Sequence, residues 1–248
     1  MKTSTTRFSD RVDDYIKFRP HYPKEIIKVL ESKIGFNKKF VIADIASGTG
    51  ISSEIFLDNG NKVFAVEPNT EMRLAAELIF GDYPNFISFD GKAENSNLVN
   101  SSIDLIFCGQ AFHWFNKSES KIEFSRILKQ NGHIVLAWNV RNEREAFQRE
   151  YEKILLSNIS EYKEVSHKNI SEKIIREFFE PKVLHFHSFE NFQEFDLEGL
   201  KGRLQSSSYC PKEGPEHDQL FKEITSLFLK YKKNGLVKFN YETKMYYC

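Results

Sequence analysis

Cysteine is scarce in this chain, and its net charge is zero. The three cysteines among 248 residues (Cys108, Cys210 and Cys248) are odd in number and widely spaced, so no disulfide framework or zinc-site spacing is visible. The 35 basic residues balance the 35 acidic residues, which argues against a protein that binds nucleic acid by counterion release. We therefore expect no metal and no nucleic-acid partner.

Long apolar runs are also missing. No run approaches the ~20 residues that a membrane-spanning helix needs. The beginning of the chain, MKTSTTRFSDRVDDY, lacks the apolar segment of a signal peptide. These absences predict a cytoplasmic protein with no membrane partner.

The composition is that of a globular protein with a large core. Hydrophobic residues make up 40% of the chain and charged residues 28%, with 23 phenylalanines. A chain of this length and composition suits one large α/β domain. We expect a single domain over residues 1–248, with a lid and first helix at 1–38, a core at 39–140 and a helical cover inserted at 191–235.

Short apolar segments alternate with helical patterns through the first 140 residues. Strands separated by helices of about ten residues predict a parallel sheet with helices on both faces. A turn at Asn131-Gly132 is expected to precede the fifth strand, and the tail predicts a further strand. The predicted strands are 40–45, 62–66, 86–89, 103–108, 133–138, 183–189 and 236–247, and the predicted helices are 24–34, 51–58, 70–80, 117–128, 143–157, 170–179 and a later one around 220–231.

The most specific pattern is Asp44-Ile-Ala-Ser-Gly48-Thr-Gly50, which lies at a strand-to-helix turn. Glycines in such a turn let a ligand approach the backbone, and the start of the helix offers unpaired N–H groups. Glu67, at the end of the next strand, can accept hydrogen bonds from both ribose hydroxyls of a nucleoside. Alternatively, this is a plain glycine turn and Glu67 is only a charge at a helix N-terminus.

Two cofactor classes use this geometry. A nicotinamide cofactor requires G-x-G-x-x-G, and here Ser53 stands at the third glycine position. Asp44 would repel a pyrophosphate but attract a sulfonium compound with an ammonium group. The residues therefore favour S-adenosyl-L-methionine over a nicotinamide cofactor.

The stretch VIADIASGTG (41–50) resembles motif I of class I S-adenosylmethionine-dependent methyltransferases, with Ala46 in place of the first motif glycine. The resemblance extends through VEPNTEM (66–72), residues 89–115 and RILKQNGHIVLAWN (126–139). FSDRVDDYIKFRPHYP (8–23) is similar to the opening of the small-molecule branch called methyltransferase type 11, which includes proteins like trans-aconitate methyltransferase. SSSYCP (206–211) is a looser match. The resemblance implies a Rossmann-like, doubly wound, mostly parallel seven-stranded sheet with an antiparallel last strand and a helical cover.

The resemblance also implies roles for individual residues. Asp44 would hold the methionine ammonium group, directly or through water, and Glu67 would bind the ribose. Arg19 and Tyr15 would lie near the cofactor carboxylate and the transferred methyl group. The cofactor-binding residues implied in this way are Arg19, Asp44, Ala46, Gly48, Gly50, Glu67, Pro68, Met72, Ala93, Glu94 and Gln110.

The segment Gln110-Ala-Phe-His113-Trp114-Phe115 follows the predicted fourth strand, at the end where open α/β sheets bind ligands. Gln110 and Trp114 can donate N–H bonds to a carboxylate acceptor, whereas His113 can donate or act as a base. We predict Gln110, His113, Trp114 and Tyr15 as catalytic residues. The alternative is that the aromatic residues simply fill the space under the cover.

These observations predict methyl transfer from S-adenosylmethionine to a small molecule, with O-methylation of a carboxylic acid as the first hypothesis. The sequence lacks an N-P-P-Y-type segment after the fourth strand, a Pro-Cys nucleophile, a paired-glutamate loop and a carboxylate cluster for metal-dependent chemistry. A nicotinamide-dependent oxidoreductase and a non-catalytic cofactor-binding scaffold are the alternatives. The oligomeric state is not determined by the sequence.

Overall fold

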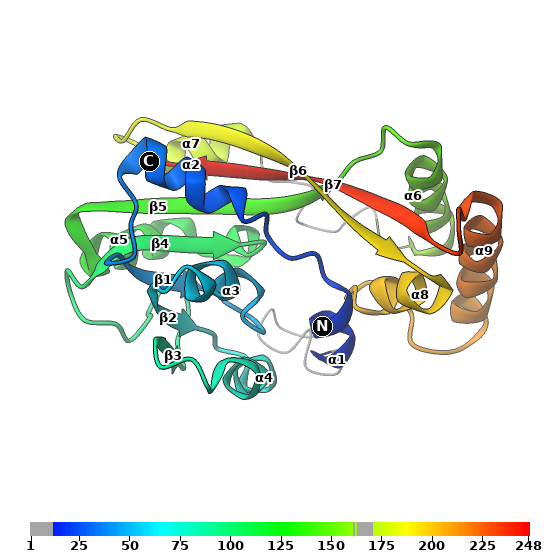
Figure 1. Cartoon of the computed structure of the whole chain (residues 1–248), viewed down its shortest axis with the longest axis horizontal. Helices are drawn as coiled ribbons and strands as arrows, with labels where there is room; N and C mark the ends of the chain where they lie inside the picture. The colour runs from blue at the N-terminus through cyan, green and yellow to red at the C-terminus, as the bar shows by residue number, and fades with distance from the viewer. Residues whose placement is uncertain (1–11, 161, 163–170) are drawn as a thin grey trace.

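The computed structural model describes residues 12–160, 162 and 171–248 (Figure 1). Its centre is a seven-stranded sheet of order β3-β2-β1-β4-β5-β7-β6. The pairs β1–β2, β1–β4, β2–β3 and β4–β5 are parallel, whereas β7 runs antiparallel to both β5 and β6. This confirms the predicted fold class. The strands are β1 Val41–Ile45, β2 Lys62–Val66, β3 Phe86–Phe89, β4 Ile103–Gly109, β5 Leu128–Arg141, β6 His185–Phe195 and β7 Val237–Tyr247.

Helices cover both faces of this sheet. Side chains of α2 (Glu25–Ile34), α3 (Ile51–Asp58) and α4 (Thr70–Phe80) pack on one face, around Ile42 and Leu105. Side chains of α5 (Lys117–Ile127) and α7 (Glu172–Phe179) pack on the other face, around Ala43 and Ile106. Successive strand residues point to opposite faces, so the buried strands are apolar at almost every position.

A third core lies beyond the end of the sheet. It is formed by α6 (Ala146–Asn158), α8 (Leu197–Gln205), α9 (Pro215–Tyr231) and the near ends of β6 and β7, at the right of Figure 1. The long strand β7 joins the two regions, because Phe239 and Tyr241 pack in this third core while Met245 and Tyr247 pack on α2 and α3. The helix α1 (Val12–Phe18) lies against α8.

The start of the cover and the turn at Asn131-Gly132 differ from the sequence prediction. Residues 191–195 continue β6, so the cover begins with α8, and α6 from the preceding segment completes it. Asn131 and Gly132 lie within β5 and form no turn, because the β4–β5 pairing shifts register between Ile103 and Leu105 and absorbs the extra residues there. Residues 1–11 of the predicted lid, and residue 170 of the predicted helix 170–179, lie outside the described residues.

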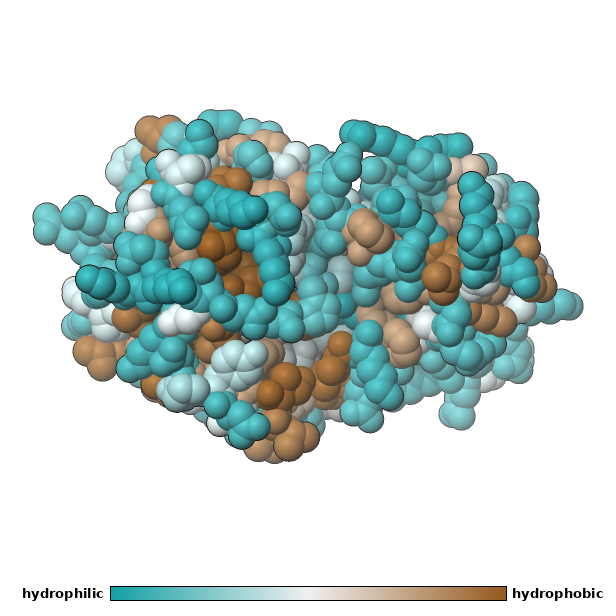
Figure 2. All heavy atoms as spheres, viewed as in Figure 1, coloured by the Kyte–Doolittle hydropathy of each residue, from teal (hydrophilic) through white to brown (hydrophobic). Residues whose placement is uncertain are grey.

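The surface in the view of Figure 2 is mainly hydrophilic, with separate apolar patches. Within the described ranges, no helix has the length and apolar character needed to cross a membrane.

Candidate active site

A cavity of about 610 Å³ lies between the carboxyl ends of the parallel strands and the helical cover. This is the edge at which doubly wound sheets bind ligands, and the volume is in the usual range for a small-molecule site. The strand side contributes residues after β1, β2, β4 and β5, and the cover side contributes residues beside α1 and within and after α8. Twelve of the predicted site residues line it: Tyr15, Arg19, Ala46, Gly48, Glu67, Pro68, Met72, Ala93, Glu94, Gln110, His113 and Trp114.

The turn after β1 forms one wall through an unusual backbone. Ala46 has φ +58° and Gly48 also has φ +58°, a left-handed conformation that favours glycine. Gly48 lies over Met72, whose sulfur would be 3.8 Å from an added Cβ. The motif residue Ala46 thus keeps the backbone conformation of the glycine that it replaces.

Gly50 has a structural role different from the predicted one. It does not line the cavity, and an added Cβ would lie 2.4 Å from Cε2 of Phe80. With φ +86°, it lets α3 begin while the ring of Phe80 packs against the turn. Gly50 therefore shapes the turn by allowing the close contact with Phe80, and it is not among the residues that line the cavity.

Asp44 lies one layer beneath the cavity. It is fully buried, and its carboxylate accepts hydrogen bonds from Ser53 Oγ at 2.7 Å and from Ser52 Oγ at 2.8 and 3.0 Å. Burial raises the pKa of Asp44 to about 6, although the two serine hydroxyls oppose this shift. Ser52 lines the cavity and Asp44 does not, so Asp44 lies behind Ser52 as seen from the cavity.

Glu67 ends β2 and faces the cavity. Its Oε2 accepts from the Gly48 N–H at 2.8 Å and its Oε1 from the Asn69 N–H at 2.8 Å. Burial raises the pKa of Glu67, and the two backbone hydrogen bonds oppose this. Asn69 also caps α4, accepting from the Met72 N–H at 2.8 Å. Each carboxylate oxygen of Glu67 keeps a second lone pair for a ligand hydroxyl.

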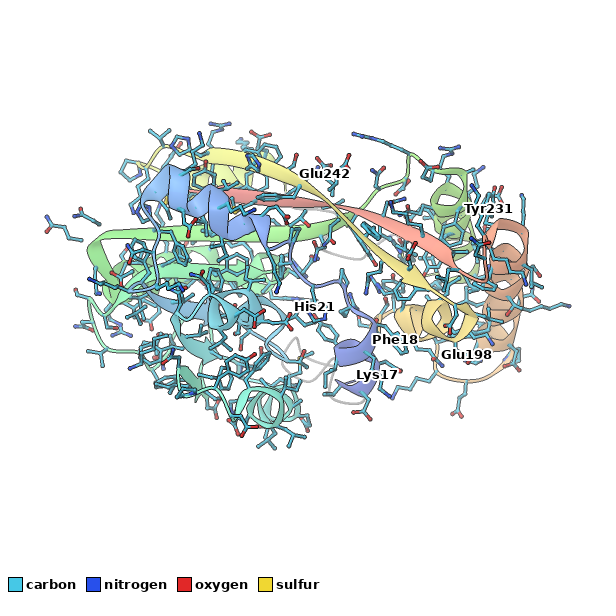
Figure 3. The ribbon with its side chains drawn as sticks, viewed as in Figure 1. Lys17, Phe18, His21, Glu198, Tyr231 and Glu242 are labelled. Atoms are coloured by element: carbon cyan, nitrogen blue, oxygen red, sulfur yellow. The ribbon has the colours of Figure 1, made fainter. Side chains whose placement is uncertain are left out.

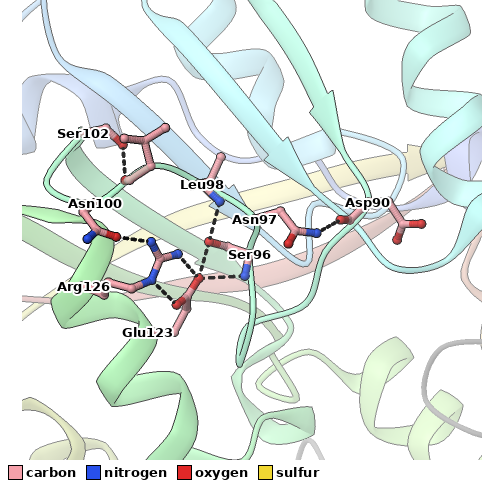
Figure 4. A network of polar contacts seen from close by, with 9 residues as sticks. Asp90, Ser96, Asn97, Leu98, Asn100, Ser102, Glu123 and Arg126 are labelled. Atoms are coloured by element: carbon pink, nitrogen blue, oxygen red, sulfur yellow. Dashed lines mark hydrogen bonds and ion pairs between the residues drawn. The ribbon is translucent and has the colours of Figure 1, made fainter.

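The segment that carries Ala93 and Glu94 is held in place by a buried carboxylate on α5 (Figure 4). Glu123 accepts from Ser96 N–H at 2.7 Å and from Ser96 Oγ at 2.5 Å, and it pairs with Arg126 at 2.7 Å. Burial alone would raise the pKa of Glu123, but these hydrogen bonds lower it to about 2.

The predicted acceptor segment divides between the cavity and the core. Phe112, in the short helix Phe112–Trp114, is fully buried and contacts Phe178 of α7. His113, Trp114 and Phe115 line the cavity. Gln110 has φ +58°, and its Nε2 donates to the Asn139 carbonyl at 3.1 Å. Phe112 thus fits the packing interpretation, whereas His113 and Trp114 lie where an acceptor in the cavity could contact them.

The cavity also has polar atoms for which the protein supplies no partner. The hydroxyls of Tyr22 and Ser47 and the indole Nε1 of Trp138 line or border it, are buried, and make no hydrogen bond within the described part of the chain. Buried donors are normally satisfied, so a ligand is the natural partner.

The sequence interpretation missed the charged residues of the cover side. Arg141 at the end of β5, Arg203 on α8 and Tyr209 after α8 all line the cavity. The only sequence signal for this region was the loose match SSSYCP (206–211), which contains Ser208 and Tyr209. No cluster of three or more metal-ligating side chains occurs among the residues that the structure describes.

Comparison with known proteins identifies the strand side of this site. The sequence profile of the methyltransferase domain family matches residues 43–136, which contain the motif turn, Glu67, Ala93 and the acceptor segment. Over these residues the chain is similar to methyltransferase domains.

Proteins similar to this chain occur in distant organisms. An uncharacterized methyltransferase of Schizosaccharomyces pombe is 32% identical over 136 residues, which is 54% of this chain and 53% of the relative. An uncharacterized methyltransferase of Mycobacterium tuberculosis is 30% identical over 148 residues, or 60% of this chain and 58% of the relative. The chain thus spans little more than half the length of these curated relatives.

Solved structures share the fold of this chain beyond residues 43–136. A protein assigned as a type II methyltransferase from Anaeromyxobacter dehalogenans matches with TM-score 0.66 and 18% identity, over 93% of this chain and 95% of that chain. A protein assigned as a methyltransferase of an antibiotic biosynthesis pathway in Anabaena variabilis matches with TM-score 0.63 and 21% identity, over 92% and 98%. At these identities the likeness concerns the fold, including its cover.

Proposed function

We propose that this chain transfers the methyl group of S-adenosylmethionine to a small-molecule acceptor. The observation that supports this most is Glu67, a buried carboxylate that faces the cavity beside the turn after β1. The remaining lone pairs of Glu67 suit the ribose hydroxyls, and Gly48 and Met72 suit the methionine part. The unpartnered hydroxyl of Ser47 fits a polar ligand at the same turn.

Further residues support the rest of the cofactor. Ala93 and Glu94 suit the adenine, on a segment that Glu123 holds in place. Arg19 suits the cofactor carboxylate, and Asp44 acts from beneath through Ser52. The bound cofactor supplies an activated methyl carbon for in-line displacement, and the chain mainly orients the acceptor and excludes water.

We propose a carboxylic acid as the acceptor, methylated on oxygen. A carboxylate is ionised at neutral pH, so its reaction needs no base, and the cavity offers N–H donors on Trp114 and Trp138 to orient it. The resemblance to trans-aconitate methyltransferases supports the same class. If the acceptor is instead a hydroxyl, amine or thiol, His113 is the residue placed to take its proton.

The first test concerns the cofactor. Glu67→Ala is expected to weaken binding of S-adenosylhomocysteine at least tenfold, about 1.4 kcal/mol, in calorimetry. Glu67→Gln, which keeps one acceptor oxygen, is expected to lose less. Unchanged affinity in Glu67→Ala would show that Glu67 does not bind the ribose.

The second test concerns the reaction. Incubation of a panel of acids with methyl-labelled cofactor is expected to yield base-labile methyl esters. Turnover of amines or phenols only would contradict the carboxylic acid and favour His113 as a base. Tight binding of NADH alone would favour the oxidoreductase alternative, and cofactor binding with no turnover of any acceptor would favour the scaffold.

The single domain over residues 1–248, the cytoplasmic location and the absence of a nucleic-acid partner remain part of this proposal. The zero net charge agrees with the absence of a nucleic-acid partner. The packing of the cover on the extended strands β6 and β7 agrees with a single domain.

A further inference from the structure

The cover side of the cavity contains an excess of buried positive charge. Three guanidinium groups line it, those of Arg19, Arg141 and Arg203. Arg141 is paired with Glu152, at 2.9 Å between Nη2 and Oε2, and also contacts Tyr162. Neither of the other two arginines forms an ion pair with a carboxylate of the described chain.

Arg203 is bonded only to neutral groups. It is 7% exposed, and its Nε donates to the Tyr241 hydroxyl at 3.1 Å. Its Nη1 donates to the hydroxyls of Ser207 at 3.2 Å and Ser206 at 3.5 Å. Its Nη2 makes no hydrogen bond within the described residues, so two N–H donors on the cavity-lining side chain remain for a ligand.

Arg19 increases this charge. Its Nη2 donates to the Ser206 carbonyl at 2.7 Å, and its guanidinium lies 4.8 Å from the ring centre of Tyr15. Burial and the nearby charge of Arg203 lower the pKa of Arg19 to about 10, which leaves it protonated at neutral pH. Two like charges therefore lie close together, and no carboxylate of the described residues pairs with either of them.

A buried cation without a counter-ion is strongly unfavourable, because it loses hydration and gains no compensating ion pair. A ligand that brings anionic groups into the cavity would remove this cost. The cofactor carboxylate supplies one such group at Arg19. A second anion is needed for Arg203.

We propose that the methyl acceptor carries an oxyanion group, a carboxylate or a phosphate, that binds to Arg203 as an anchor separate from the atom that receives the methyl group. This inference rests on the proposed methyltransferase function and specifies its substrate class. The anchor and the nucleophile are different groups, since charge-assisted hydrogen bonds from a guanidinium draw electron density from the oxyanion and make it a weaker nucleophile. Arg203 is a specificity-determining residue in this proposal.

The test uses the full chain saturated with S-adenosylhomocysteine. Succinate, glutarate, adipate and inorganic phosphate are titrated by calorimetry, with butyrate as the monoanionic probe and dimethyl succinate as the uncharged probe. At least one dianionic probe is expected to bind the original protein and to lose at least tenfold affinity in Arg203→Gln. The diacids and phosphate distinguish the two sources of the oxyanion.

Two controls separate the anchor from other roles. Arg176→Gln makes the same substitution at an exposed arginine that pairs with Glu172 on α7, and it is expected to change no affinity. The affinity of Arg203→Gln for S-adenosylhomocysteine is expected to stay within about threefold of the original value. With the diacid that is methylated fastest, KM is expected to rise at least tenfold while kcat changes less, as for a group bound equally in ground and transition states.

Several outcomes would overturn the proposal. They are equal probe affinities in Arg203→Gln and the original protein, binding of uncharged dimethyl succinate as tight as that of the diacids, or loss of S-adenosylhomocysteine affinity in folded Arg203→Gln. If Arg203→Gln does not fold, Arg203→Lys is measured in its place, because lysine keeps the positive charge but lacks the planar guanidinium with its paired N–H donors. An affinity of Arg203→Lys for every probe equal to that of the original protein would then contradict the anchor. Failure of the original protein to bind S-adenosylhomocysteine at all would contradict the methyltransferase function instead.

Discussion

Ala46 shows at the scale of one residue how a motif can keep its conformation while its sequence changes. The motif glycine is replaced, yet Ala46 has φ +58°. Its Cβ is disfavoured there by close contact with the backbone, at a cost of about 1–2 kcal/mol for an L-residue. The turn is therefore maintained by its surroundings, including the hydrogen bond from the Ser47 N–H to the Val66 carbonyl at 3.2 Å.

Ala46→Gly is expected to raise the free energy of unfolding by up to about 1 kcal/mol, because the relief of strain exceeds the entropic cost of glycine. Denaturant unfolding measures this. The matched control is Ala43→Gly in β1, where φ is not in the left-handed region, and this change is expected to destabilise the protein. A loss of stability in Ala46→Gly would show that the turn is not strained.

At the scale of elements, α1 and α8 pack closely because Gly202 of α8 has no side chain. A Cβ at Gly202 would lie 2.1 Å from Cε2 of Phe18, so only glycine allows the two helices this distance. Figure 3 shows Phe18 at the end of α1, next to α8. Arg19 follows directly and bonds to the Ser206 carbonyl, so this packing positions two cavity-lining residues of the N-terminal segment, Tyr15 and Arg19.

Gly202→Ala is expected to displace α1, to cost about 1–3 kcal/mol of stability by overpacking, and to weaken S-adenosylhomocysteine binding through Arg19. Gly199→Ala on the same helix is the control, since its nearest contacts of 3.0 Å and 3.1 Å are with side-chain atoms that need to move little. Adding Phe18→Ala is expected to recover part of the stability, and strict additivity of the two changes would contradict the contact.

At the scale of the whole molecule, stability depends on pH through buried carboxylates of opposite behaviour. Burial raises the folded pKa of Asp44 to about 6, so the folded state binds a proton more readily than the unfolded chain. Glu123, with its folded pKa lowered to about 2, contributes stability above about pH 4.5 that is lost as the pH falls toward 2.

Asp44→Asn, which cannot titrate, isolates the first effect. As the pH falls from 8 to 4, the original protein is expected to gain stability relative to this variant by about 2 kcal/mol, most of it between pH 6 and 4. Parallel denaturant titrations at pH 8, 6 and 4 measure the difference. A difference that stays constant with pH would mean that Asp44 does not titrate in this range.

The strand side of the site could be predicted because its residues lie at the ends of short strands that alternate regularly with helices along the sequence. Glu67 lies at the end of a predicted strand, and Asn69 caps the helix that follows. Ten of the proposed site residues line the cavity from this side, and the other two, Tyr15 and Arg19, line it from the cover side. Asp44 and Gly50 belong to the same motif but lie behind the wall, which only side-chain packing decides.

The sequence by itself determined the parallel sheet, the motif turn and the kind of domain, because each depends on local periodicity, on turn residues and on a ligand-binding motif within about 100 residues. Only the tertiary structure brought Arg19, Arg141 and Arg203 to one side of one cavity, from segments more than 60 residues apart. A zero net charge conceals this concentration, since a total over 248 residues contains no information on position. The electrostatics of the acceptor site arise from burial and proximity, and these exist only in the folded chain.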